Sequence, residues 1–181
     1  MDQVRDRISK AYELPKGTGV FLSPSGSDAE YFALLIVKLI NPGKKVVNIV
    51  TCNEEVGSGT LAAAGGRFFS PLEPFGGYHN HIEGGPKMDD PVHELADGVE
   101  TVAINAREPS GDVVNPHSKI EETLKKCKED GSVPIVHSVY GSKTGICHEY
   151  TDTYRDQIKE MNGLQVIDAC QGRFDVQWLY G

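Results

Sequence analysis

Several features that mark particular protein classes are missing from this sequence of 181 residues. It has no apolar run near the ~20 residues that a membrane-spanning helix needs, and no signal-peptide pattern at its start. Its lysines and arginines form no cluster, and the formal net charge is -8, so a positive patch for nucleic-acid phosphates is lacking. These absences exclude a membrane span and nucleic acid as a main partner, and we expect a cytoplasmic protein.

Cysteine is scarce and shows no pattern. The cysteines form no Cys-x-x-Cys pair and no spacing typical of metal ligands, which favours a reduced intracellular protein; they are Cys52, Cys127, Cys147 and Cys170. His79 and His81 lie in a glycine-rich stretch without an organised third ligand, so we expect no metal. The run Tyr140–Thr144 resembles part of a phosphate-binding Walker loop but lacks two of its glycines, and we discount it.

What the sequence does contain is an alternation of strand-like and helix-like segments within a length that suits one domain. Hydrophobic periodicity and punctuation by Gly, Pro and Asn predict helices over 2–12, 27–40 and 57–64, and further helices from Asn115-Pro116 and from Thr151. Short apolar runs predict strands over 19–23, 45–50, 99–104, 133–138 and 164–168. The helix over 27–40 is apolar nearly all round, so we expect it to be buried, and we expect 70–98 to be a long surface excursion.

Strands that are apolar on both faces and alternate with helices indicate an α/β fold with a mostly parallel sheet covered on both sides. The carboxyl ends of such strands share one edge, where open α/β sheets bind ligands. Polar side chains follow four of the predicted strands: Ser23 and the loop 25–28, Asn53 and Glu55, the segment from Ser138 through Tyr140 to Thr144, and Asp168 with Gln171. The pattern therefore predicts a ligand site at that edge.

Two groups at this edge suggest what the ligand is. The loop Ser25-Gly26-Ser27-Asp28 leads into a helix, whose first amide groups and positive dipole end stabilise a phosphate, although Ser27 with Glu30 also fits a simple capping box. Asp168 ends an apolar strand, where a carboxylate either caps the next helix or pairs with a protonated ring nitrogen. A phosphate loop and a carboxylate for a pyridinium together match pyridoxal 5′-phosphate.

With these motifs the chain resembles the large domain of the fold-type I pyridoxal-phosphate-dependent transferases, in the style of class V aminotransferases and cysteine desulfurases, from about Val4 to Gly181. The segment 25–30 is similar to their phosphate loop, 168–171 to their Asp-x-x-Gln, and 142–145 to a loop near the cofactor. The resemblance implies a division of the cofactor contacts. Ser25, Gly26, Ser27 and Asp28 would bind the phosphate, Asp168 the pyridine nitrogen, and Gln171 with the loop carrying Ser142 and Thr144 would lie near the ring oxygen.

The sequence departs from that family in ways that limit the interpretation. No lysine follows Asp168, where the family's Schiff-base lysine is expected, and Asn53–Glu55 offers no histidine or aromatic ring to stack on the cofactor. Lys143 precedes the aspartate strand, so we expect it at the solvent or substrate edge. The family's small C-terminal domain is also absent, so residues 1–181 are interpreted as a partial large domain, catalytically incomplete as this chain.

The resemblance implies that the full-length form is a homodimer acting on a small amine or amino acid, as a transaminase or a sulfur or carbon lyase. Two other interpretations stay open at this point. One is a non-catalytic binding or interaction module that retained the fold, and the other is a Rossmann-like nucleotide-binding domain, although no Gly-x-Gly-x-x-Gly follows the first predicted strand.

Overall fold

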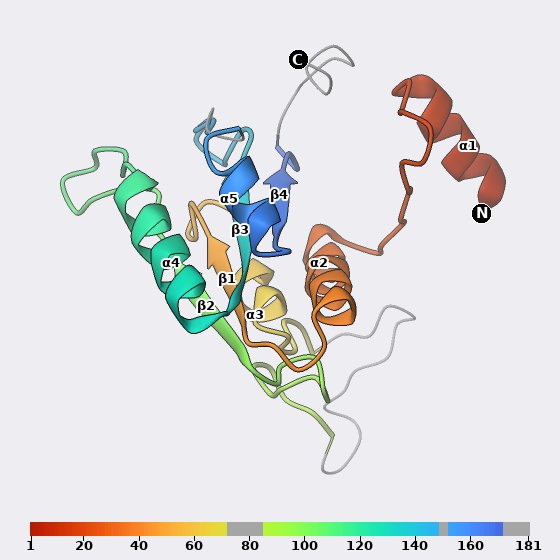
Figure 1. The fold of residues 1–181 in the computed structure, drawn as a ribbon. Coiled ribbons are helices and arrows are strands. Elements are labelled where there is room, and N and C mark those ends of the chain that lie inside the picture. Colours follow the sequence, from red (N-terminus) through yellow and green to blue (C-terminus); the bar gives the residue numbers. More distant parts are fainter. Residues whose placement is uncertain (72–84, 149–151, 172–181) are drawn as a thin grey trace.

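A four-stranded parallel sheet forms the centre of the molecule in the computed structural model, which describes residues 1–71, 85–148 and 152–171 (Figure 1). Its strands stand in the order β2-β1-β3-β4. The bounds are β1 Val46–Val50, β2 Val99–Ala103, β3 Val133–Val139 and β4 Leu164–Asp168. Every residue of β1 and β3 is buried, whereas β2 and β4 contain exposed residues. The expected parallel α/β sheet is confirmed.

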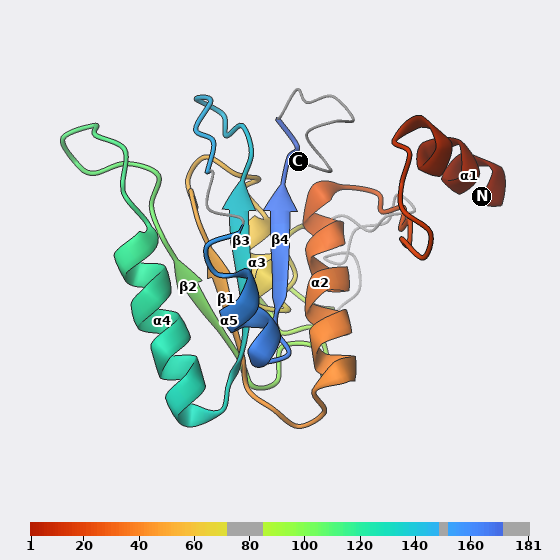
Figure 2. The ribbon, with the colours of Figure 1, turned by 45° about the horizontal axis from the view of Figure 1, so that its top comes forward.

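Helices cover both faces of this sheet (Figure 2). Helices α2 (Gly26–Ile40) and α3 (Thr60–Ala64) lie on one face, and α4 (His117–Asp130) and α5 (Arg155–Glu160) lie on the other. The face under α2 packs Leu34, Val37, Val46, Val133 and Ile135. The face under α4 and α5 packs Val47, Ile49, Val136, Ile120, Leu124 and Ile158. Each fully buried side chain of this kind contributes about 1.5–3 kcal/mol, so the sheet is a firm base for the loops at its carboxyl edge.

Two expectations for the amino-terminal part are wrong. Residues 19–23 form no strand, because this short apolar run pairs with no neighbouring strand of the described chain, and Phe21 is left exposed. Helix α2 is not buried all round either: Leu35, Leu39 and Ile40 are exposed, because only one side of the helix contacts the sheet. The first predicted helix is confirmed as α1 (Asp2–Ala11), which has no buried residue.

Further along the chain, α5 begins at Arg155 rather than near Thr151, which itself lies outside the described residues. Of the predicted surface excursion 70–98, residues 72–84 lie outside the described part, and so do His79 and His81. The described end of this excursion is tied to α2, where Lys38 Nζ donates to the carbonyls of Glu94, Leu95 and Asp97 at 2.7–2.9 Å. No helix within the described ranges has the length and apolar character needed to cross a membrane.

Candidate functional site

A cleft of about 310 Å³ opens at the carboxyl ends of β3 and β4, beside the start of α2. Its walls include five of the eight residues predicted to bind a cofactor, namely Ser25, Gly26, Ser27, Asp168 and Gln171. Asp28, Ser142 and Thr144 are not among the residues that line it. The parallel topology thus brings the two ends of the predicted site to one place, although they are separated by well over a hundred residues of sequence.

The start of α2 forms one wall of the cleft, and Ser25 is its N-cap. Ser25 Oγ accepts a hydrogen bond from the Asp28 amide at 3.2 Å and donates to Asp28 Oδ2 at 2.6 Å. The capping pair is therefore Ser25 with Asp28, and the alternative of a capping box from Ser27 to Glu30 is wrong, because the helix begins at Gly26. The amides of Gly26 and Ser27 have no acceptor within the helix, since helix geometry provides none in the first turn.

Small residues let the walls approach one another closely. A Cβ on Gly26 would lie 3.2 Å from Cys170 Sγ, in the turn that follows β4. A Cβ on Gly57 would lie 3.0 Å from Thr60 Oγ1 and 3.6 Å from Ser27 Oγ. A side chain at either glycine would therefore press on a neighbouring side chain, so both positions favour glycine.

Asp168 stands at the end of β4 and forms the opposite wall. Its Oδ1 accepts a hydrogen bond from the Cys170 amide at 3.0 Å, and its carbonyl accepts one from the Tyr140 amide at 2.8 Å. The first bond closes an Asx-type turn that fixes the direction of the carboxylate. Asp168 is therefore held at the cleft edge by its own turn and by the loop after β3.

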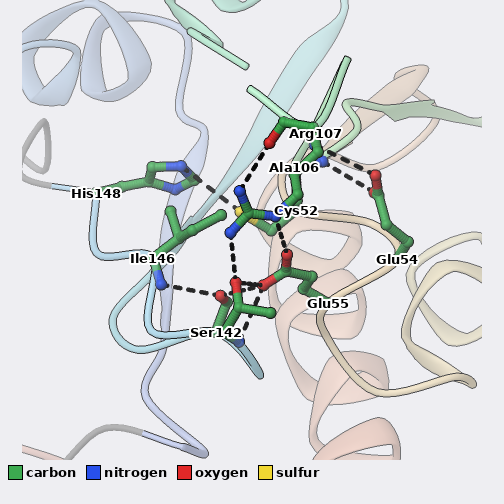
Figure 3. A network of polar contacts seen from close by, with 10 residues as sticks. Cys52, Glu54, Glu55, Ala106, Arg107, Ser142, Ile146 and His148 are labelled. Carbon is green, nitrogen blue, oxygen red and sulfur yellow. Dashed lines mark hydrogen bonds and ion pairs between the residues drawn. The ribbon is translucent and has the colours of Figure 1, made fainter. Parts of the chain in front are cut away.

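Ser142 belongs to a network around Glu55 (Figure 3). Thr144 also bonds to Glu55. Glu55 Oε2 accepts from Ser142 Oγ at 2.5 Å, Thr144 Oγ1 at 2.6 Å and the Thr144 amide at 3.1 Å, and Oε1 accepts from Arg107 Nε at 3.1 Å. These bonds, those from Ser142 and Thr144 first, lower the pKa of Glu55 to about 2. The network, which we call the Glu55 clasp, joins the loops after β1, β2 and β3.

The neighbouring Glu54 also joins the loop after β1 to the loop after β2, because its carboxylate accepts hydrogen bonds from the amides of Ala106 at 2.9 Å and Arg107 at 3.4 Å. Lys143, on the same loop as Ser142, lines the cleft, is exposed, and donates from Nζ to the carbonyl of Val56 at 2.6 Å. Sequence reasoning placed Glu55 at this edge but gave it no partner, and it missed Arg107 entirely. Glu55 and Arg107 are far apart in the sequence and come together only because β1 and β2 are neighbours in the sheet, so no local sequence pattern predicts their contact.

Cys52 and His148 form another close pair, with Cys52 Sγ 3.6 Å from His148 Nε2 (Figure 3). Cys52 is buried and follows β1 with a φ of 52°. Burial, with the charges of Glu55 and Glu54, raises its pKa to about 12. A thiol with such a pKa is inert at neutral pH, so this pair supports the loop structure and is no nucleophile.

Sequence reasoning also missed His137, and it considered Glu30 only as a capping residue and as part of the phosphate-loop segment. Glu30 lines the cleft from α2, and His137 lies beneath it on β3. The sequence did contain a signal for Glu30: it precedes Ala33, Leu34 and Val37 by three, four and seven positions, which places it on the buried stripe of the helix. An acid on that stripe is not a surface capping residue.

Among the described residues, no group of three or more His, Cys, Asp or Glu side chains is arranged to hold a metal ion. No family model matches the sequence, and no curated protein matches it. Solved structures do resemble the fold. One is the glutamate decarboxylase domain of a diaminobutyrate-pyruvate transaminase and L-2,4-diaminobutyrate decarboxylase from Vibrio parahaemolyticus, at 13% identity and a TM-score of 0.50. Another is mouse CSAD, at 16% identity and a TM-score of 0.51.

These matches cover 95% and 94% of this chain but 34% and 31% of the two structures, so the chain spans about one third of their length. At such identities the likeness concerns the fold. It shows that the four-stranded parallel sheet and its helices have the same fold as part of these two structures. It gives no support to the narrower class V aminotransferase branch.

Proposed function

We propose that this chain is the cofactor-binding part of a pyridoxal-phosphate-dependent enzyme that cleaves a carbon–carbon bond of an amino acid, with decarboxylation as its reaction. The observation that carries the proposal is the cleft itself, which joins the start of α2 to Asp168. One wall offers amide groups to an anion and the other offers a carboxylate to a cation. A molecule with a phosphate at one end and a protonated ring nitrogen at the other matches both walls.

The residues present fit pyridoxal 5′-phosphate. The amides of Gly26 and Ser27 would hold the phosphate, helped by the positive end of the α2 dipole. Gly26 and Gly57 leave room for it, since a Cβ at either position would meet a neighbouring atom within 3.2 Å. Asp168, aimed by its bond from the Cys170 amide, would keep the proton on the ring nitrogen, and Gln171 would lie near the ring oxygen.

When bound, the cofactor supplies an electron sink for the bond that breaks. The chain's own contribution is electrostatic and positional. Asp168 would maintain the positive charge of the ring nitrogen, and the Glu55 clasp fixes the loop that carries Lys143 at the cleft. Lys143 would lie at the solvent or substrate edge, as sequence reasoning expects, and in the proposed enzyme its ammonium group would be available to a substrate carboxylate there.

Decarboxylation is preferred to transamination or sulfur transfer because of the structures that share the fold. One of them is by name a glutamate decarboxylase domain. The proposal also includes a homodimer in the full-length form, as the family resemblance implies.

The test uses ligand binding by the 181-residue chain. Pyridoxine 5′-phosphate, which has the ring and phosphate but no aldehyde to react with surface lysines, is titrated by calorimetry beside pyridoxine and NAD. We expect the phosphorylated ring to bind at least about tenfold more tightly than pyridoxine, because only the phosphate gains the helix dipole and the charge-assisted hydrogen bonds of the N-terminal amides, together worth about 1.4 kcal/mol or more. Asp168→Asn is expected to weaken binding, and Asp152→Asn, an exposed control, is not. Preferential binding of NAD, or no binding, would overturn the proposal.

A further inference from the structure

Glu30 and His137 form a buried acid–base pair at the floor of the cleft. Glu30 Oε2 lies 3.4 Å from His137 Nε2, and their side chains are 9% and 2% exposed. Neither atom makes a hydrogen bond within the described part of the chain. Glu30 also lines the cleft. An acid whose buried oxygen is left without a hydrogen bond beside a ligand cleft is costly to retain for packing alone.

At neutral pH this pair is uncharged. Burial, and then the charge of Asp168, raise the pKa of Glu30 to about 8. Burial lowers the pKa of His137 to about 4, against the opposite pull of Asp168. Glu30 therefore carries a proton and His137 does not. The acid is kept neutral chiefly by its surroundings and in part by a negative charge that a bound cation would offset.

The ionisable groups around Glu30 come from several elements. His137 faces it from β3, Asp168 from β4, and Cys170 from the turn after β4. Burial first, then the hydrogen bond and charge of Asp168 and the charge of Glu30, raise the pKa of the Cys170 thiol to about 11. Glu55 and Lys143 line the same cleft. The charge that acts on Glu30 is thus that of Asp168, the residue proposed to meet the ring nitrogen.

We propose that Glu30 is the second carboxyl of a cation subsite: it lines the cleft together with Asp168 and releases its proton to water when a cationic ring nitrogen binds. The proton leaves the Glu30 hydroxyl, and the resulting carboxylate stabilises the ligand's positive charge together with Asp168. Two neighbouring carboxyls in a dry site cannot both ionise unless a cation balances them. This inference rests on the proposed cofactor, and it adds a residue and a pH dependence to that site.

The experiment compares wild type with Glu30→Gln, which keeps the shape and removes the ionisation. Pyridoxine 5′-phosphate is titrated by calorimetry between about pH 6.5 and 8.5, in two buffers of different ionisation enthalpy. Because release of one proton makes affinity rise by at most tenfold per pH unit, we expect the wild type to gain about three- to tenfold in affinity over this range relative to Glu30→Gln. Wild-type protein should also release more protons on binding than Glu30→Gln. The ligand's own titration is the same in both cases and cancels in the comparison.

A second measurement does not depend on the variant. The side-chain carboxyl carbon of Glu30 is followed by NMR in labelled wild-type protein, and it should titrate near pH 8 without ligand and at lower pH with it. Glu122→Gln, an exposed change on α4, should behave as wild type. Binding with the same pH dependence in Glu30→Gln, or a Glu30 carboxyl that already titrates in the ordinary acid range, would overturn this inference and leave the proposed function standing. Absence of binding in the wild type would contradict both.

Discussion

The ionisation of Glu30 has a consequence for stability that needs no ligand. Its folded pKa of about 8 lies above the ordinary 4.5, so it stabilises the fold at low pH and loses that contribution as pH rises to about 8. His137, with a folded pKa of about 4 instead of 6.5, gains stability as pH rises to about 6.5. The two effects oppose each other between about pH 4.5 and 6.5, and only the loss from Glu30 remains above that range.

We therefore expect the loss from Glu30 to lower the free energy of unfolding by about 1.5 kcal/mol between pH 6.5 and 8, since each pH unit of differential protonation is worth about 1.4 kcal/mol and Glu30 is half ionised at pH 8. Glu30→Gln should abolish this fall, because the variant has no proton to lose. Urea unfolding followed by circular dichroism at several pH values measures it. An identical slope in wild type and variant would show that Glu30 does not titrate in this range.

At the scale of single elements, the N-terminus of α2 offers a sharp comparison between two serines. Ser25 caps the helix through the Asp28 amide, whereas Ser27 lies in the first turn and makes no cap. Ser25→Ala should cost about 1 kcal/mol of stability. Ser27→Ala should leave stability nearly unchanged, and thermal unfolding of the two variants side by side distinguishes them. Equal losses would mean that the helix begins at a different residue in solution.

The Glu55 clasp links secondary-structure elements, because it joins the loops after three strands. Glu55→Ala removes the acceptor of Ser142, Thr144 and Arg107 at once. We expect a loss of about 2 kcal/mol, between the ~1 kcal/mol of an exposed ion pair and the ~3–5 kcal/mol of a buried one, because Arg107 is 37% exposed. Glu54→Ala is the matched control: it removes an acceptor of backbone amides only and should cost less. Chemical denaturation measures the free energy of unfolding of both variants. A larger loss in Glu54→Ala than in Glu55→Ala would contradict this prediction.

Sequence patterns predict the parts of this molecule that are decided locally. The β-branched run of β1 and the periodic apolar residues of α4 specify their own structure, and the topology rule for parallel strands then places Asp168 near Ser27. The run 19–23 failed because a strand needs a partner, which no local pattern supplies. Glu30 was misread for a related reason: Ser-x-x-Glu is a capping signature only when the helix starts at that serine, and here the Ser25 cap starts it earlier. The contacts of Arg107 with Glu55 and of His137 with Glu30 depend on the order of the strands in the sheet, which no local sequence pattern predicts.

At the scale of the whole molecule, stability is distributed unevenly, and α1 lies at the weak end. Both views show α1 standing apart from the sheet (Figures 1 and 2). It buries no residue, and a hydrogen bond from Arg5 Nε to the carbonyl of Val20 at 3.1 Å joins it to the following segment. By contrast, β1 and β3 are buried along their whole length. Local opening should therefore be easy at α1 and should require global unfolding at the central strands.

Deletion of residues 1–17 tests this difference. Because the segment contributes no buried residue to the core, the free energy of unfolding should change by less than about 1 kcal/mol. Hydrogen exchange of the intact chain should show α1 amides exchanging quickly, while those of β1 and β3 exchange only as the whole protein unfolds. Ligand binding at the cleft should be retained after deletion, since none of the deleted residues lines it. Strong protection of α1, or a loss above about 2 kcal/mol on deletion, would show that its apolar face is covered in solution.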